Sequence, residues 1–378
     1  MRDDLFEIVF AGGGTGGHLF PALAVAEELR RCLPEASVNF IGGKRGLEQT
    51  LVPRAGYKLR SLGLWGLKGK GALARIKAVV AAGMAVVRCA AWFVSSRPKL
   101  VIGVGGYASG PAVLAAWLLN VLKILKIKTM VLEQNHFPGA TNRFLAPRVD
   151  AVCVPSADAQ KRLGCPATIT GNPVRAAFRE IGDPPGGSRL SIVIFGGSQG
   201  SRSINQALPR ILQNLPSGTT TPRIVHQTGM ADETAVRAAY AGYPAELIDI
   251  QSFIEDMPAC LAAADLAICR AGATTVAELA AGGRGAILIP LPHAADDHQR
   301  HNAETLAKVG AARIVSDQEL AGDSLGSIIE ELASDPGLTR RMGHAAASLD
   351  LPHATERIAQ IAMSLISGEP KRNDDAVS

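Results

Sequence analysis

The sequence predicts an α/β protein composed of two doubly wound domains, each built on a mostly parallel sheet. A strand, a glycine-rich turn and a helix follow one another at the start of both halves, at residues 10–21 and 190–203. Of all residues 47% are hydrophobic but only 4% are aromatic, a composition typical of helices packed on parallel strands. Because 378 residues exceed one ordinary core, we expect two domains of roughly 150–200 residues that face each other across a cleft.

The first unit is a strand over residues 8–10 and a helix over residues 22–33, where apolar residues recur at helical spacing. Between them, Gly12, Gly14 and Gly17 match the pattern G-x-G-x-x-G. This pattern predicts an anion such as phosphate at a helix N-terminus, because free backbone N–H groups and the helix dipole favour negative charge there.

A second strand is expected over residues 38–41, and its end carries no carboxylate. An NAD site needs an Asp or Glu near this position to hold the ribose diol. Lys44 and Arg45 stand there instead and leave an NADP site open.

Two apolar helical runs in the first half, residues 64–99 and 112–128, are interleaved with basic and aromatic side chains. These side chains are Trp65, Lys68, Lys70, Arg75, Lys77, Arg88, Trp92, Phe93, Arg97, Lys99, Trp117, Lys123, Lys126 and Lys128. The runs are either core helices with solvated lysines or a patch whose apolar face enters lipid while Lys and Arg meet anionic headgroups. The most apolar window, residues 78–94, contains Arg88 and is short for a bilayer, so we expect it to lie on a membrane rather than across it.

Polar residues follow the next predicted strands of the first half. Residues 101–111 read as another strand, glycine turn and helix start, and a strand over residues 129–132 leads into Glu133, Gln134 and Asn135. The carboxyl edge of a parallel sheet is where open α/β folds bind ligands. The same cluster could instead be a loop held by hydrogen bonds between side chains and backbone.

The glycine- and proline-rich segment 171–188 marks the expected domain boundary. Beyond it, the pattern of strand and glycine turn restarts, with a strand over residues 190–195. Further on we expect strands over residues 266–269 and 286–289, with a helix over residues 275–281 between them.

Thr275 and Glu278 stand in the T-x-x-E relation of a capping box. The spacing of Thr275 and Glu278 alone favours a capping role for both residues. A carboxylate one turn into a helix at the sheet edge could also accept both hydroxyls of a ribose.

A cluster of potential metal ligands follows the last of these strands. It comprises His293, Asp296, Asp297, His298, Gln299, His301 and Asn302. His and Asp suit zinc or manganese, but no glutamate or third histidine stands at a familiar spacing, and hydroxyl-rich ligands need the same donors and acceptors. The chain contains no Asp-x-Asp pair, so we expect helix N-termini, backbone N–H groups, Ser198 and Arg175 to neutralise phosphate.

Charge, cysteine spacing and the two ends of the sequence bear on other classes of protein. A net charge of +5 is no nucleic-acid signature by itself, and the six cysteines form no C-x-x-C pair. The N-terminus lacks the regions of a signal peptide. A last helix is expected over residues 355–366, and residues 368–378 resemble a disordered polar tail.

Six motifs occur in one order along the chain. They are residues 13–18 (GGTGGH), 105–111 (GGYASGP), 133–135 (EQN), 171–175 (GNPVR), 196–200 (GGSQG) and 271–278 (AGATTVAE). Together they closely resemble the MurG family of bacterial glycosyltransferases, a GT-B family classified as family 28. The resemblance covers nearly the whole chain. Departures are Arg284-Gly285, where a residue followed by Pro is usual, Ser201 in place of Ala, and His298 in place of Gln.

The resemblance implies a GT-B fold with divided roles. Residues 1–173, completed by a C-terminal helix at about 353–367, would bind the lipid acceptor and the membrane, and residues 174–352 would bind the UDP-sugar donor. The implied donor-site residues are Thr15, Gly16, Gly17, Asn135, Arg175, Ser198, Phe253, Ile254, Met257, Ala273, Thr274, Thr275, Glu278, Gln299 and Asn302. The implied acceptor-site residues are Gly14, Thr15, Gly105, Gly106, Tyr107, Ser109 and Asn135.

Within the donor site, the resemblance assigns particular roles. Phe253 and Ile254 would flank the uracil, Glu278 would hold the ribose diol, and Gln299 and Asn302 would read the sugar hydroxyls. Ser198 and Arg175 would face the diphosphate.

The implied reaction is an inverting transfer of N-acetylglucosamine from UDP-N-acetylglucosamine to the C4 hydroxyl of undecaprenyl-pyrophosphoryl-N-acetylmuramyl-pentapeptide, forming a β-1,4 bond. His18 is the candidate base, since a helix N-terminus disfavours its protonation, and Glu133 is the second candidate. His18 could instead cap the turn or contact the acceptor diphosphate. No cofactor or metal site is expected, and a divalent ion would at most stimulate the enzyme.

The resemblance also implies partners and a location. Expected partners are the two substrates, an anionic membrane surface and other cell-wall synthesis proteins, without nucleic acid. The expected location is the cytoplasmic face of the bacterial inner membrane, as a peripheral protein. The alternatives are another UDP-sugar lipid glycosyltransferase, an NADP-dependent oxidoreductase, or a non-catalytic partner of a transferase.

Overall fold

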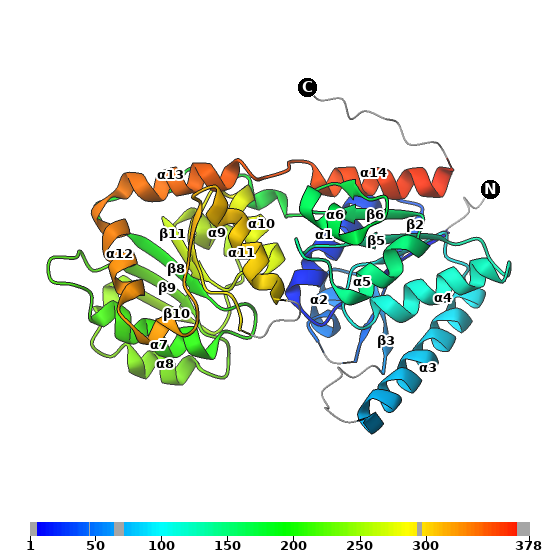
Figure 1. Ribbon diagram of the computed structural model, residues 1–378, viewed down its shortest axis with the longest axis horizontal. Coiled ribbons are helices and arrows are strands. Elements are labelled where there is room, and N and C mark those ends of the chain that lie inside the picture. Colours follow the sequence, from blue (N-terminus) through cyan, green and yellow to red (C-terminus); the bar gives the residue numbers. More distant parts are fainter. Residues whose placement is uncertain (1–5, 45, 64–71, 293–296, 369–378) are drawn as a thin grey trace. The chain divides into compact units, whose positions relative to one another are not determined.

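The computed structural model describes residues 6–44, 46–63, 72–292 and 297–368. The chain divides into two compact units (Figure 1). Unit 1 comprises Met1–Pro173 and His353–Ser378, and unit 2 comprises Val174–Pro352. The expectations for Arg45, Trp65, Lys68, Lys70, His293, Asp296 and the tail beyond residue 368 lie outside the described residues.

Unit 1 is built on a seven-stranded sheet whose strands all pair in parallel, in the order β3-β2-β1-β4-β5-β6-β7. The strands are β1 (Phe6–Ala11), β2 (Ala36–Gly43), β3 (Lys58–Leu62), β4 (Leu100–Gly103), β5 (Lys128–Leu132), β6 (Ala151–Val154) and β7 (Thr168–Ile169). The helices are α1 (Gly16–Cys32), α2 (Glu48–Arg54), α3 (Ala72–Ser96), α4 (Ser109–Val121), α5 (Ala140–Leu145), α6 (Ala157–Leu163) and α14 (Ala354–Ser367), with the 3-10 turn η1 (Ala146–Arg148).

Helices cover both faces of the unit 1 sheet, because side chains alternate along each strand. Ile8 and Phe10 of β1 belong to a core with α1 and α14. Val9 and Ala11 belong to a second core with α3 and α4. Helix α14 therefore completes unit 1, although the whole of unit 2 separates it from β7 in sequence.

Unit 2 is built on a six-stranded parallel sheet in the order β10-β9-β8-β11-β12-β13. The strands are β8 (Ser191–Phe195), β9 (Arg223–Gln227), β10 (Ile248–Gln251), β11 (Leu266–Cys269), β12 (Gly285–Leu288) and β13 (Ala312–Ile314). The helices are α7 (Arg202–Gln213), α8 (Glu233–Ala239), α9 (Met257–Ala262), α10 (Ala273–Ala281), α11 (His298–Lys308), α12 (Ser324–Ser334) and α13 (Pro336–Ala347), with 3-10 turns η2 (Ala176–Phe178), η3 (Ala245–Leu247) and η5 (Glu319–Ala321). The predicted fold class of two doubly wound parallel-sheet domains is confirmed.

The starts of two helices differ from the expectation, and several elements were not predicted. Helix α1 begins at Gly16, not at residue 22, so two of the three motif glycines precede it and the third lies inside its first turn. Helix α10 begins at Ala273 with Gly272 as its N-cap, so the capping box interpretation of Thr275 is wrong. Several elements were not predicted at all, among them helix α2 and strands β3, β7, β9, β10 and β13.

Both sheets reverse their strand order at one point, which is where open α/β sheets bind ligands. In unit 1 the reversal lies between β1 and β4, and in unit 2 between β8 and β11. Each of these four strands ends in one of the motif loops found in the sequence.

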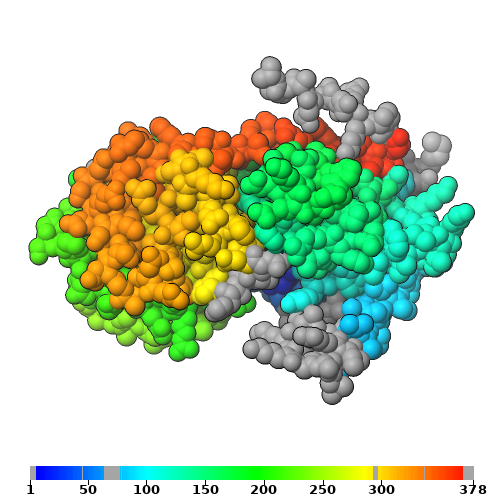
Figure 2. All heavy atoms as spheres, viewed as in Figure 1, coloured from blue at the N-terminus to red at the C-terminus, as the bar shows by residue number. Residues whose placement is uncertain are grey.

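Helix α3 lies beside α4 at the surface of unit 1 (Figures 1 and 2). Within the described chain, Val79–Ser96 is the one helical segment that is long and apolar enough to cross a bilayer, judged by length and composition. Only 17% of this segment is buried in the protein. Core packing therefore accounts for only part of its apolar character.

Candidate functional site

The glycine turns after β1 and β4 of unit 1 lie against each other. A Cβ on Gly106 would come within 2.5 Å of the carbonyl oxygen of Gly13, and one on Gly12 within 2.5 Å of that of Gly105. All four glycines also have positive φ angles between 78° and 156°. Glycine is required because side chains fit neither the backbone conformation nor the space. Gly105 and Gly106 thus shape the loop that precedes α1.

A buried carboxylate closes the first of these turns. Glu48, at the start of α2, is 1% exposed and accepts hydrogen bonds from Gly14 N at 2.8 Å and Gly43 N at 2.9 Å. Gly14 was predicted to bind the acceptor, yet its N–H group is occupied by Glu48. The N–H group of Gly14 is therefore not available to an anion at this loop. Sequence reasoning missed Glu48, because its partner Gly14 is 34 residues away.

His18 lies in the first turn of α1 and is half-buried. Its Nδ1 is 2.9 Å from Oε1 of Gln134, which follows β5. The ring also packs on the β4 turn, because a Cβ on Gly105 would lie 2.8 Å from ring atoms Cε1 and Nδ1. The structure thus brings together three of the six motifs around one imidazole.

The carboxylate of Glu133 is hydrogen-bonded to the loop that follows β5. It is 3% exposed. Oε1 accepts from Asn135 N and Nδ2, and Oε2 accepts from Gly139 N and Asn142 Nδ2, at distances between 2.8 and 3.1 Å. With four donors on two oxygens, the carboxylate holds the loop after β5. This arrangement favours a structural role over that of a base.

The remaining acceptor-site candidates differ in exposure. Tyr107 is 63% exposed, and Thr15 is exposed at the N-cap of α1 without capping through its side chain. Gly16 and Gly17 form the first residues of α1. Ser109 is fully buried at the start of α4, so its contact with the acceptor stays a prediction.

In unit 2, the loop after β8 carries the motif Gly196–Gly200 and leads into α7. Gln227, at the end of β9, is 2% exposed and joins this loop to the next one. Its Nε2 donates to Gly197 O at 2.8 Å, and its Oε1 accepts from Ile254 N at 2.9 Å. A single amide therefore fixes the distance between the glycine turn and the segment predicted to flank the uracil. Within that segment, Phe253 is 45% exposed and Ile254 is 5% exposed.

Arg270 joins three loops at the same sheet edge. It follows β11, is 8% exposed, and pairs with Asp317 at 2.6 Å. It also donates to Ser201 Oγ at 3.0 Å and Ser203 Oγ at 2.6 Å, beside the glycine turn, and to Ile289 O at 3.0 Å, after β12. Ser201, which stands where the MurG family usually has Ala, therefore contributes a hydroxyl group that accepts a hydrogen bond from Arg270.

Glu278 lies in α10 and is half-buried. Burial raises the pKa of its carboxyl group to about 7, and the positive charge of Arg175 partly opposes that rise. Arg175 also lies over the Phe178 ring at 4.9 Å. A carboxyl group whose pKa is shifted close to neutral pH is a common feature of ligand sites. Because a diol donates two hydrogen bonds, it would favour the ionised form.

The other predicted donor contacts fall into two groups. Ala273, Thr274 and Thr275 form the first turn of α10, where backbone N–H groups face the sheet edge. Asn302 is fully buried and donates to Ala271 O at 3.2 Å, and Gln299 Oε1 accepts from Leu291 N at 2.9 Å. These two side chains hold loops around the site, and their contact with sugar hydroxyls stays a prediction. Ser198 is half-buried in the β8 loop, and Met257 begins α9.

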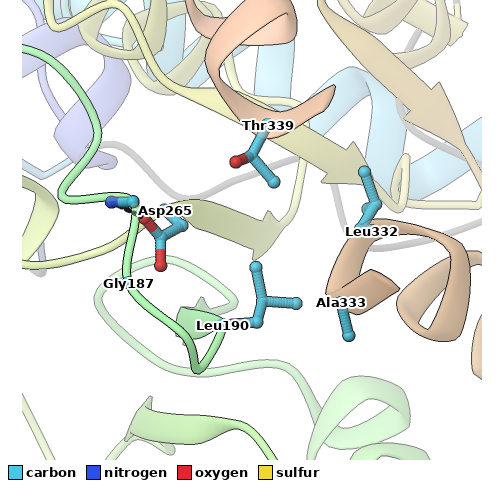
Figure 3. A pocket seen from close by; sticks show the side chains of 7 residues that line it. Gly187, Leu190, Asp265, Leu332, Ala333 and Thr339 are labelled. Atoms are coloured by element: carbon cyan, nitrogen blue, oxygen red, sulfur yellow. Dashed lines mark hydrogen bonds between the residues drawn. The ribbon is translucent and has the colours of Figure 1, made fainter. Parts of the chain in front are cut away.

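Two other features were considered as sites. In the described ranges, no group of three His, Cys, Asp or Glu side chains is arranged to hold a metal ion. A small hollow in unit 2 is lined by Gly187, Leu190, Asp265, Leu332 and Thr339 (Figure 3). Asp265 accepts from Gly186 N and Ser191 N, at 2.8 and 2.9 Å. The hollow thus lies where β8 and β11 begin, at the edge of the sheet opposite the motif loops.

Comparison with known proteins agrees with this architecture. Residues 8–154 match the glycosyltransferase family 28 N-terminal domain, and residues 191–358 match the C-terminal domain of the same family. Two curated relatives, from Syntrophus aciditrophicus and Myxococcus xanthus, are 43% and 40% identical to the chain. The alignments cover 95% and 96% of this chain and 98% and 94% of the relatives. Both are named UDP-N-acetylglucosamine–N-acetylmuramyl-(pentapeptide) pyrophosphoryl-undecaprenol N-acetylglucosamine transferase.

Solved structures show the same fold. MurG from Acinetobacter baumannii aligns with a TM-score of 0.74 and 31% identity, over 95% of this chain and 99% of that one. The calicheamicin glycosyltransferase CalG4 aligns with a TM-score of 0.67 at 15% identity, which shows the fold alone. Fold and motif loops thus define a family 28 glycosyltransferase of the GT-B class. Within that class, the chain belongs to the MurG family. This membership decides against the oxidoreductase alternative.

Proposed function

We infer that the protein transfers N-acetylglucosamine from UDP-N-acetylglucosamine to N-acetylmuramyl-(pentapeptide) pyrophosphoryl-undecaprenol, a lipid-linked precursor of peptidoglycan. The observation that carries this function is the identity of 43% over 95% of the chain to a relative of that name. In the reaction, the acceptor C4 oxygen forms a bond to the anomeric carbon while the bond from that carbon to the diphosphate breaks. UDP leaves with the electron pair, and the hydroxyl proton passes to a base.

We propose that unit 2 binds the donor at its switch point. Glu278 accepts the ribose hydroxyls, and the segment at Phe253 and Ile254 holds the uracil. Arg175 and the N–H groups at the start of α10 stabilise the negative charge of the diphosphate. These groups are held in place before the donor arrives, because Gln227 and Arg270 brace the loops. The proposed chemistry needs no metal ion, although a divalent cation could assist.

We propose that unit 1 binds the acceptor around the start of α1, with His18 as the general base. Three loops converge on this histidine, from β1, β4 and β5. The start of α1 also offers backbone N–H groups to the acceptor diphosphate. Glu133 is the weaker candidate, because both of its oxygens already accept hydrogen bonds.

We propose further that unit 1 attaches to an anionic membrane surface, as a peripheral protein on the cytoplasmic side. Helix α3 exposes Val79, Val80, Met84 and Val87, each at least 54% exposed. Residues 121–128, after α4, add exposed apolar side chains beside three lysines. An apolar face flanked by cations suits the boundary between headgroups and acyl chains. An acceptor with a polyprenyl chain would also be found there.

The decisive experiment is incubation of the purified protein with UDP-N-acetylglucosamine and the lipid-linked muramyl acceptor. We expect a lipid-linked disaccharide and one UDP per turnover, with or without a metal chelator. Absence of product under both conditions would refute the proposed activity. Parallel reactions with UDP-glucose and with diacylglycerol should be far slower, and preference for either would support a different lipid glycosyltransferase.

His18→Ala tests the base separately. We expect turnover to fall about 10²–10⁴-fold, the usual contribution of general base catalysis. Turnover within about threefold of the wild-type rate would remove His18 as the base while leaving the transferase activity in place.

A further inference from the structure

We propose that Gln134 is a positioning residue that holds His18 in the tautomer with its proton on Nδ1, so that Nε2 is the atom that accepts the acceptor hydroxyl proton. The inference rests on the proposed function, because it concerns the base of that reaction. To that function it adds the ring nitrogen of His18 that accepts the proton and the residue, Gln134, that determines this choice.

The hydrogen bonds of Gln134 fix the direction of its side chain. The residue is 1% exposed, and its Nε2 donates to the carbonyl oxygen of Leu132 at 3.2 Å. Only the NH₂ end of an amide can donate to a carbonyl oxygen. The Oε1 end must therefore face the other way, where His18 Nδ1 lies at 2.9 Å.

This direction selects the tautomer. An amide oxygen can only accept, so the 2.9 Å contact requires His18 Nδ1 to donate a proton. In a neutral imidazole the other nitrogen then carries the lone pair. No described residue is hydrogen-bonded to His18 Nε2, which leaves that lone pair for a substrate hydroxyl.

The support around the pair is rigid. The main-chain oxygen of Gln134 accepts from Asn172 Nδ2 at 2.8 Å, which holds the residue from the segment after β7. The β4 turn also packs against the ring, because a Cβ on Gly105 would lie 2.8 Å from Cε1 and Nδ1. The ring therefore contacts both a backbone turn and an amide, and it cannot exchange its two nitrogens without breaking its bond to Gln134.

The amide of Gln134 is uncharged, and this affects the protonation of the imidazole beside it. The carboxylates on neighbouring loops are Glu48, bound to Gly14 N and Gly43 N, and Glu133, bound to the backbone and side chains of its own loop. The phenol of Tyr107, on the β4 turn, is largely exposed. A carboxylate in place of the Gln134 amide would stabilise the imidazolium and keep the base protonated. An amide orients the ring without adding a negative charge beside it.

The tautomer can be measured without any turnover. Protein labelled with ¹⁵N-histidine contains eight histidines, and His18→Gln identifies the signals that belong to His18. We expect proton-coupled spectra at neutral pH to show a protonated Nδ1 and a bare Nε2. In Gln134→Leu we expect a mixture of tautomers. A wild-type signal with the proton on Nε2 would overturn the inference, whatever the activity of the enzyme.

Kinetics provide the second test. Gln134→Leu should lower kcat about tenfold or more with little change in KM for the donor, since the ring loses its orientation but unit 2 is untouched. Gln134→Glu should move the acid limb of the pH–rate profile upward by about 1–3 pH units, because an adjacent carboxylate favours the protonated ring. An unchanged acid limb together with an unchanged kcat in both variants would contradict the positioning role.

Gln160→Leu is the matched control. Gln160 lies in α6 of the same unit, and its amide donates to Ala167 O at 2.6 Å rather than to a residue of the loops around His18. It should reproduce any general loss of stability without the change in pH profile. If the wild-type protein forms no disaccharide, the proposed function fails, whereas the tautomer measurement still decides the inference.

Discussion

Oε2 of Glu48 lies 2.8 Å from the backbone nitrogen of Gly14, so a carboxylate of the chain itself occupies one N–H group of the loop that resembles an anion site. The other oxygen accepts from Gly43 N at the end of β2. Glu48 thus fastens the loop after β1 to the loop after β2. The shape of the loop before α1 depends on this bond as well as on its glycines.

Glu48→Gln should therefore impair the acceptor side of the reaction. An amide offers one accepting oxygen in place of two, so either Gly14 or Gly43 loses its partner and the loop shifts. We expect kcat/KM for the lipid acceptor to fall about tenfold with donor KM unchanged, measured under saturating donor and then saturating acceptor. Glu7→Gln is the control, because Glu7 bonds Asn39 near the other end of β1 and is also buried. Equal losses in both variants would show that only stability had changed.

Donor binding should depend on pH through Glu278. Its pKa is raised to about 7 by burial, and ribose hydroxyls bind the ionised form, so binding should release a proton and strengthen as pH rises. Affinity for UDP-N-acetylglucosamine should be about tenfold weaker at pH 6 than at pH 8. Calorimetry in buffers of different ionisation enthalpy measures both quantities. In Glu278→Gln the pH dependence and the proton release should vanish, and their persistence would assign them to another group.

The same carboxyl affects the stability of the free protein. Since its folded pKa lies above the ordinary value of 4.5, the folded state binds more protons than the unfolded state between pH 4.5 and 7. The contribution of Glu278 to stability therefore decreases as pH rises through this range. Glu278→Gln should remove that decrease.

Two buried arginines of unit 2 offer a matched comparison. Arg270 joins the loops of the candidate donor site, whereas Arg284 is fully buried and donates to backbone oxygens that include Leu261 O and Gly182 O, before β12 begins. Arg270→Lys should raise KM for the donor about tenfold, because an ammonium cannot reach all the loops that the guanidinium joins. Arg284→Lys should lower the free energy of unfolding by about 1–3 kcal/mol through unpaired carbonyls, and leave KM unchanged. The reverse pattern would contradict the assigned roles.

Membrane attachment can be tested by substituting one exposed methionine in each unit. Met84→Glu on α3 should reduce binding to anionic phosphatidylglycerol vesicles about tenfold, because burial of a methionine side chain is worth about 1.5–3 kcal/mol. Met230→Glu changes a residue of unit 2 that is 88% exposed, against 60% for Met84, and should have no effect. Flotation at low and high salt measures the partition. Equal binding of the wild type to neutral phosphatidylcholine vesicles would contradict the electrostatic part of the proposal.

The sheet cores could be predicted from sequence because buried parallel strands are short, continuous apolar runs. The segments LVIG of β4 and LAIC of β11 are of this kind. Edge strand β3, with the sequence KLRSL, has no such run and was missed. Helix α10 was placed two residues late, because T-x-x-E resembles a cap while the cap is Gly272.

The arrangement of the site was harder to predict than its motifs. The contact between His18 and Gln134 joins residues 116 positions apart, and Arg270 reaches Ser201 across 69. No local pattern marks such pairs, because they form only when strand order brings two loops to one edge of a sheet. Gln134 lies in its motif between Glu133 and Asn135, and the hydrogen bonds on which its proposed role rests cannot be read from the sequence.

The position of α14 has a consequence for how the molecule is made. Its residues Ile358, Ala359, Ile361 and Ala362 belong to the same core as β1 and α1, yet they are synthesised after the whole of unit 2. Unit 2 is continuous in sequence and can close its core while the chain is still growing on the ribosome. Unit 1, although it begins first, keeps an apolar face open until the ribosome has passed residue 362. Unit 1 therefore cannot complete its core before unit 2 has been made, whereas the N-terminal domain generally folds first during synthesis.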